Sequence, residues 1–321
     1  MSRKPPRPNR ANQSQSRERQ AAERARQSAL AAQRARARRR RSVVGVAAGV
    51  ILVVLAVLVI FRFPSTLSGS GNASSPVSQT PVPETILAAL KDVPAERFST
   101  VGAGGITALP TPVRAATLRG QSGLPLIVYI GAEYCPYCAA ERWPLIIALD
   151  RFGSFTGLKL AQSASDDVYP NTPTFTFYGA TYTSQYLTFQ AVETATSERS
   201  GSGYKPLQTL SAEQQQLLSK YDVSPYVPAQ SAGAIPFIDF ANQYVVVGST
   251  YDASVLQGKN WDQIAQSLAN PSSAQAQGIL GSANILTASI CLATGDNPAS
   301  VCGRPEIKSI EADLAKAPVP K

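Results

Sequence analysis

Hydrophobic residues are unevenly distributed along the chain, and the most apolar stretch is residues 43–61, which carries no charge. Nineteen residues span about 28 Å as a helix, close to the thickness of a bilayer's hydrocarbon core, about 30 Å. No polar face interrupts the run, which disfavours a buried core helix, and the run is longer than the apolar core of a signal peptide. The pattern predicts one uncleaved transmembrane helix over residues 42–63.

The remaining segments alternate between strand-like and helix-like patterns. Residues 64–83 are rich in Ser, Gly, Pro and Thr and predict a flexible stalk. Residues 126–130 form an apolar run typical of a strand buried on both faces, and residues 235–240 and 244–247 flank a polar turn, which predicts a hairpin. Helices are also expected over residues 84–93, 211–221, 261–268, 274–293 and 305–317, and strands over 174–178 and 182–191. This alternation predicts an α/β domain over residues 84–321.

The chain has 321 residues and a formal net charge of +9, but the charge is concentrated at one end. Residues 1–41 hold fourteen Lys or Arg and two Glu, a net charge of +12, so the remaining 280 residues carry −3. Arginines beside a membrane span stay cytoplasmic, which predicts a cytoplasmic tail over residues 1–41 and places the domain outside the cell membrane. The tail lacks interleaved aromatic residues for base stacking, so we expect no nucleic-acid partner.

The chain contains no histidine, which excludes Ser-His-Asp and Cys-His catalysis and His-ligated zinc. Its candidate chemistry lies in Cys135 and Cys138, on the turn between the strand at 126–130 and the helix that follows. Backbone N–H groups and the dipole at a helix N-terminus favour the thiolate of the first cysteine, and the second lies one turn away. We expect Cys135 to be the nucleophile of thiol–disulfide exchange and Cys138 the resolving thiol.

The four cysteines allow other uses. A structural disulfide between Cys135 and Cys138 would close a very short loop and add little stability. Zinc would need two further ligands, and Cys291 and Cys302 lack zinc-site spacing, so we expect no metal and no dissociable cofactor. Spacing favours the pairs 135–138 and 291–302. Outside the cytoplasm the second pair is expected to be a structural disulfide, with a redox pair that relays electrons as the alternative.

The string GAEYCPYCAAERW at residues 131–143 resembles the active-site turn of the thioredoxin superfamily, and its CPYC tetrad resembles that of glutaredoxins. The string is also similar to a membrane-anchored, thioredoxin-like family of unknown function from archaea and bacteria, over roughly residues 84–320. The resemblance implies a thioredoxin-like fold in which Ile235-Pro236 forms the cis-proline loop beside the cysteines. It also implies that Ile235, Pro236 and Tyr137 contact the substrate.

The sequence departs from the thioredoxin pattern at several positions. Thioredoxins carry a buried Asp six residues before the first cysteine, where this chain has Tyr129. Ninety-seven residues separate Cys138 from Pro236, which implies an insertion between the active-site helix and the cis-proline strand, at about residues 154–231. Tyr137 stands where strongly oxidising relatives have His, so strong oxidising power is not implied.

Two acidic residues flank the cysteine pair, Glu133 before it and Glu141 after it. Carboxylates close to the cysteines would oppose thiolate formation, because like charges repel. We expect both to be solvated surface charges.

These observations predict a membrane-anchored, extracytoplasmic thiol–disulfide oxidoreductase that acts on cysteines of exported proteins. Such an activity implies a membrane redox partner, which no residue of the chain identifies. The alternative is a redox-inactive, thioredoxin-like module that binds an envelope protein or peptide. The long insertion and the missing Asp favour this alternative, whereas the intact cysteine pair opposes it.

Overall fold

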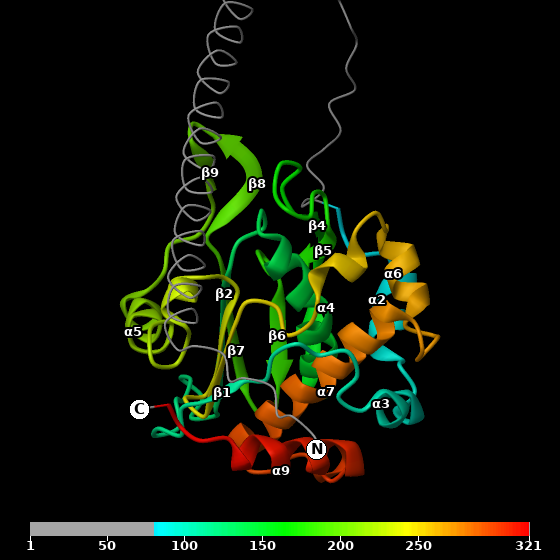
Figure 1. The fold of residues 1–321 in the computed structure, drawn as a ribbon, viewed down its shortest axis with the longest axis vertical. Helices are drawn as coiled ribbons and strands as arrows, with labels where there is room; N and C mark the ends of the chain where they lie inside the picture. The colour runs from blue at the N-terminus through cyan, green and yellow to red at the C-terminus, as the bar shows by residue number, and fades with distance from the viewer. Residues whose placement is uncertain (1–79, 321) are drawn as a thin grey trace, which may run out of the picture. The chain divides into compact units, whose positions relative to one another are not determined.

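The computed structural model describes residues 80–320, so the expected cytoplasmic tail, transmembrane helix and most of the stalk lie outside the described residues. Within them, the chain forms a mixed α/β unit around a sheet with strand order β1-β11-β10-β2-β7 (Figure 1). β2 pairs in parallel with β7 and antiparallel with β10. β10 and β11 form an antiparallel hairpin, which confirms that prediction. The strands are β1 (Thr111–Pro112), β2 (Leu126–Gly131), β7 (Thr188–Glu193), β10 (Phe237–Phe240) and β11 (Tyr244–Val247).

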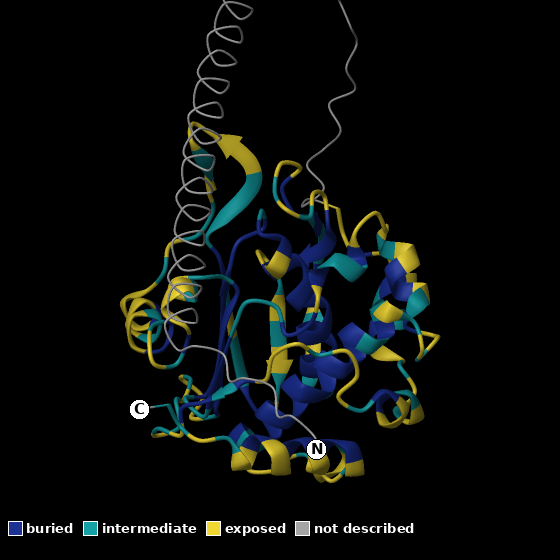
Figure 2. Cartoon of the chain, in the orientation of Figure 1, coloured by how far each residue is buried: buried dark blue, intermediate teal, exposed yellow. Residues whose placement is uncertain are grey.

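Strand β2 is buried on both faces, as its apolar run predicts. Side chains of a strand point alternately to opposite faces. Ile127 and Tyr129 therefore enter the main core, which they share with helices α4 (Pro136–Asp150) and α7 (Ala274–Thr294). Val128 and Ile130 enter a smaller core that includes Tyr221, the last residue of helix α5 (Ala212–Tyr221). Figure 2 shows this buried interior in dark blue, with the exposed residues at the periphery. The turn that follows β2 is thus supported by packing on two sides.

The helices follow the pattern of the sequence. The five helices expected beyond residue 84 are present, and α4 packs against α7. Among the described residues, α7 alone is long and apolar enough to cross a membrane, but it is a core helix with 89% of its apolar stretch buried. The helices are α2 (Glu84–Lys91), α3 (Ala95–Val101), α4 (Pro136–Asp150), α5 (Ala212–Tyr221), α6 (Trp261–Ser267), α7 (Ala274–Thr294), α8 (Ala299–Cys302) and α9 (Pro305–Lys316), with 3-10 turns η2 (Ala229–Ser231) and η3 (Ala253–Leu256).

The segment between α4 and β10 contains three antiparallel strand pairs outside the central sheet. The expected insertion at about residues 154–231 includes β7, which lies in the central sheet and pairs with β2 along its whole length. The β8–β9 hairpin extends away from the sheet (Figure 1). The pairs are β3 (Gly153–Thr156) with β6 (Thr181–Ser184), β4 (Lys159–Gln162) with β5 (Pro173–Thr176), and β8 (Ala195–Ser200) with β9 (Gly203–Pro206).

The described chain already packs against the domain before residue 83, the expected end of the stalk. Val82 is buried in the main core, and its N–H donates to the carbonyl of Leu158 at 3.2 Å. The N–H of Leu160 donates to the carbonyl of Thr80 at 2.8 Å, so residues 80–82 run beside β4. Burial of the apolar Val82 side chain away from water is favourable, which explains why this segment packs against the domain.

Candidate functional site

The two cysteines of the CPYC tetrad lie at the start of α4, as the sequence predicts. Cys135 is the N-cap residue and Pro136 occupies the first helical position, where its missing N–H costs no hydrogen bond. The N–H of Cys138 donates to Cys135 Sγ at 3.2 Å. Both are free cysteines; the side chain of Cys135 is 4% exposed and that of Cys138 is fully buried. Cys135 is thus the thiol closer to solvent.

The environments of the two thiols separate their pKa values. The Cys138 thiol, the N–H groups of Cys138 and Tyr137, and the charge of Arg142 together lower the pKa of Cys135, against the opposing effect of burial. Burial, with the hydrogen bond and charge of Cys135, raises the pKa of Cys138 well above its usual range. One thiol is therefore prepared to ionise and its neighbour to remain protonated, which is the division of roles that exchange chemistry requires.

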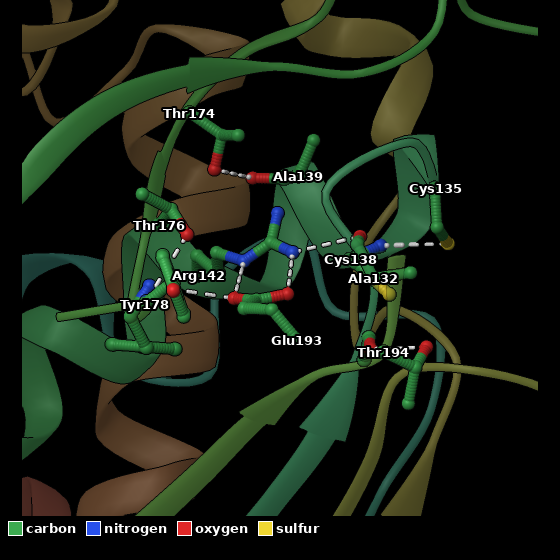
Figure 3. A network of polar contacts seen from close by, with 12 residues as sticks. Ala132, Cys135, Cys138, Ala139, Arg142, Thr174, Thr176, Tyr178, Glu193 and Thr194 are labelled. Atoms are coloured by element: carbon green, nitrogen blue, oxygen red, sulfur yellow. Dashed lines mark hydrogen bonds and ion pairs between the residues drawn. The ribbon is translucent and has the colours of Figure 1, made fainter. Parts of the chain in front are cut away.

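A buried ion pair lies directly beneath the turn (Figure 3). Arg142 of α4 donates from Nε and Nη2 to the two carboxylate oxygens of Glu193, at 2.9 and 2.6 Å, and both side chains are fully buried. Nη2 also donates to the carbonyl of Ala132 at 2.8 Å. The pair thereby connects α4 and β7 to the residues that precede Cys135. The sequence analysis did not predict this ion pair. Arg142, a charged residue in a largely apolar helix, is the local feature that points to it.

Tyr129 occupies the position at which thioredoxins carry a buried Asp. Its ring centroid lies 5.7 Å from the Arg142 guanidinium carbon, and its hydroxyl has no hydrogen-bond partner within residues 80–320. Burial raises the pKa of Tyr129 well above its usual range, so the hydroxyl stays neutral. Arg142 and Glu193, rather than residue 129, provide the charged groups beneath the cysteines.

The structure brings the predicted substrate-binding residues to the cysteines. The Cys135 thiol lies 3.5 Å from the carbonyl oxygen of Ile235, and the peptide bond between Ile235 and Pro236 is cis. Pro236 is buried, and its carbonyl accepts the N–H of Gly248 at 2.8 Å. Ile235 and Tyr137, which is 41% exposed, line an open groove of about 500 Å³. The groove therefore borders Ile235, whose carbonyl lies beside Cys135.

Both acidic residues near the cysteines are buried, so the expectation that they are surface charges is wrong. Glu133 is 3% exposed because the turn packs against β8, whose Ala195 carbonyl accepts its N–H at 2.9 Å. Glu141 is fully buried against the loop after β11, where it accepts the N–H and hydroxyl of Thr250 at 2.8 and 2.9 Å. Burial raises the pKa of Glu141 to about 7. The burial of Glu133 and Glu141 cannot be predicted from local sequence, since each residue is covered by a segment that is distant in the chain.

A family model described as a domain of unknown function (DUF929) matches residues 119–292, more than half of the chain. The chain belongs to this family. No curated protein and no solved structure matches it. The matched range holds Cys135, Cys138 and Pro236, so it covers the whole candidate site.

Cys291 and Cys302 are joined by a disulfide that connects α7 to α8. Both are fully buried. Cys291 lies within the range matched by the DUF929 family model, whereas Cys302 lies beyond it. The disulfide closes a short loop near the C-terminal end of α7, and its sulfur atoms are shielded from solvent.

Proposed function

We propose that this DUF929 member is a membrane-anchored, extracytoplasmic thiol–disulfide oxidoreductase with a thioredoxin-like core. The observation that carries the proposal is the setting of Cys135 Sγ, which accepts the N–H of Cys138 at 3.2 Å and lies 3.5 Å from the Ile235 carbonyl. The first contact favours a thiolate, and the second places the sulfur beside backbone that can pair with an extended substrate.

Several features support a thioredoxin-like core. The cysteines lie where a buried central strand enters a helix, and the Ile235-Pro236 loop precedes a strand hairpin that pairs with that same strand. This is the arrangement that the resemblance to thioredoxins implies. The uncharged segment at residues 43–61 and the arginines before it support a membrane anchor with the domain outside. Exported, cysteine-containing proteins are therefore the proposed substrates.

The reaction proceeds by two thiol–disulfide exchanges. The Cys135 thiolate attacks a substrate disulfide; the substrate S–S bond breaks, a Cys135–substrate disulfide forms, and the second substrate sulfur leaves as a thiolate that takes up a proton. Cys138 then loses its proton to solvent and attacks Cys135 Sγ, which releases the substrate's other sulfur and forms the Cys135–Cys138 disulfide. The substrate gains two electrons and two protons, which the cysteine pair loses. A dithiol donor restores the pair, and the reverse sequence oxidises substrates.

The test uses full-length protein in detergent, with insulin disulfides as substrate and dithiothreitol as donor. Cys135→Ser is expected to abolish exchange while the circular dichroism spectrum is unchanged, and Cys138→Ser to accumulate the mixed disulfide. Cys291→Ala/Cys302→Ala is the control, because it leaves the CPYC pair intact. Exchange that persists in Cys135→Ser refutes the mechanism.

The pKa of Cys135, read from the ultraviolet absorbance of its thiolate, separates the two candidate functions. A value below the ordinary one, about 8.5, supports exchange chemistry, and an ordinary value supports a redox-inactive binding module. The reduction potential of the pair gives the direction of electron flow. A potential near about −270 mV indicates a reductant and one near about −120 mV an oxidant.

A further inference from the structure

A polar cavity of about 450 Å³ lies on the side of the active-site turn formed by the β8–β9 hairpin and the loop after β4. It does not share its lining with the groove that Ile235 and Tyr137 border. We name it the hairpin pocket. Its polar lining includes Glu133, Ser163, Asn171, Thr196, Glu198 and Lys205.

The hairpin pocket is held close to the nucleophile. Glu133 precedes Cys135 by two residues, so their Cα atoms are at most about 7.6 Å apart. The N–H of Ala164, another lining residue, donates to the carbonyl of Tyr134 at 2.8 Å. The ring of Tyr134 stacks on Tyr204 of β9 with centroids 4.1 Å apart. These contacts fix both walls of the pocket relative to Cys135.

Glu133 is the charge in this pocket that has no counter-ion. Its side chain is buried, and it forms no ion pair within the part of the chain that the structure describes. Glu198 and Lys205 are exposed and lie 3.6 Å from each other. The guanidinium of Arg142 is paired with Glu193, and its charge lowers the pKa of Glu133 less than the charge of Glu193 raises it. Burial raises the pKa of Glu133, partly offset by the Thr176 hydroxyl.

A buried carboxylate without a counter-ion is unfavourable, and a cation that enters the pocket relieves this cost. An organic cation fits better than a metal ion, because residues 80–320 hold no group of three His, Cys, Asp or Glu side chains arranged for a metal. We propose that the hairpin pocket binds the ammonium or guanidinium group of a basic residue near the reacting cysteine of the substrate. This inference rests on the proposed function and narrows its substrate class to cysteine-containing polypeptides with a neighbouring Lys or Arg.

The test compares two peptides that differ only in a lysine or a norleucine two residues from a single cysteine. Each cysteine carries a thionitrobenzoate group as a mixed disulfide, so that attack by full-length protein releases a coloured thiolate. We expect the second-order rate constant of this single-turnover attack to be about tenfold higher for the lysine peptide, since hydrogen bonds to charged groups are strong. Glu133→Gln is expected to reduce this ratio to below about twofold, whereas the exposed Glu213→Gln on α5 leaves the ratio unchanged.

Equal second-order rate constants for the two peptides with wild-type protein overturn the proposal, as does a lysine preference that persists in Glu133→Gln. If Glu133→Gln does not fold, Thr196→Arg introduces a cation at the pocket wall and is expected to remove the preference. Saturable stimulation of the norleucine peptide by lysinamide would identify a free amine as the ligand and overturn the assignment to a substrate side chain. Failure of the proposed function is recognised separately, by exchange that persists in Cys135→Ser.

Discussion

Replacement of Arg142 by methionine tests whether the buried ion pair holds the active-site turn. Arg142 and Glu193 are fully buried and share two hydrogen bonds, at 2.9 and 2.6 Å, while a third joins Arg142 to the Ala132 carbonyl at 2.8 Å. Methionine preserves the apolar stem but leaves a carboxylate without a counter-ion in the interior. Loss of one partner of a buried pair costs about 3–5 kcal/mol. At about 2–4 °C per kcal/mol for a domain of this size, we expect Tm to fall by about 10 °C.

The same substitution is expected to weaken the nucleophile. The positive charge of Arg142 lowers the pKa of both Cys135 and Cys138, so its removal raises both. The rate of Cys135 alkylation by iodoacetamide, followed against pH, reports this change, because the thiolate is the species that reacts. We expect the alkylation profile of Arg142→Met to shift to higher pH.

Thermal unfolding of full-length protein in detergent, followed by circular dichroism, measures the expected fall in Tm. Arg142→Met/Glu193→Leu removes both charges and is expected to recover more than half of the lost Tm, because an apolar pair of similar volume replaces a buried ion pair at little cost. Arg199→Met is the matched control: it breaks the pair with Asp166, in which both side chains are about half exposed, and should lower Tm far less than Arg142→Met does, because exposed ion pairs contribute little to stability. A loss in Arg142→Met no greater than in this control, or no recovery in the double variant, refutes the reasoning.

Two further predictions concern stability. The pKa of Glu141 rises on folding from 4.5 to about 7, so the folded state binds more protons between these values and stability falls by about 3 kcal/mol as pH rises from 4.5 to 7. Burial also raises the pKa of Asp239 to about 7 and those of Asp150 and Asp222 to about 6, and all three act in the same direction. Glu141→Gln should therefore lower the slope of Tm against pH without abolishing it; an unchanged slope contradicts this. Cys291→Ala/Cys302→Ala opens a disulfide loop with a sequence separation of 11, which is expected to cost about 3 kcal/mol of unfolding free energy in denaturant titration. Insulin reduction should persist in this variant, and its loss from folded protein would instead indicate an electron relay.

The sequence was informative wherever a local pattern determined the outcome. The apolar run at residues 126–130 and the polar turn after residue 240 predicted β2 and the β10–β11 hairpin, because each pattern has one compatible way to bury its side chains. The position of the cysteines at the strand-to-helix turn was also predicted from local pattern, because the apolar strand precedes them directly. The strand expected over residues 182–191 corresponds to two strands, β6 and β7, and the sequence of β7, TFQAVE, carries no signal of its parallel pairing with β2. Parallel partners are distant in sequence, and local pattern does not identify them.

The charged residues around the cysteines show why the rest of the site could not be predicted from the sequence. Arg142 finds its partner 51 residues away, and Glu141 finds Thr250 109 residues away, so only the folded chain reveals that these side chains are buried and paired. Glu133 is buried too, and within residues 80–320 it forms no ion pair. Glu141 also meets no cation: its partner is the neutral Thr250, as Thr176 is for Glu133. What separates Glu133 from Glu141 is its place in the lining of the hairpin pocket, where a cation that arrives with the substrate can reach it. The position of Glu133 therefore supports a substrate cation in the hairpin pocket.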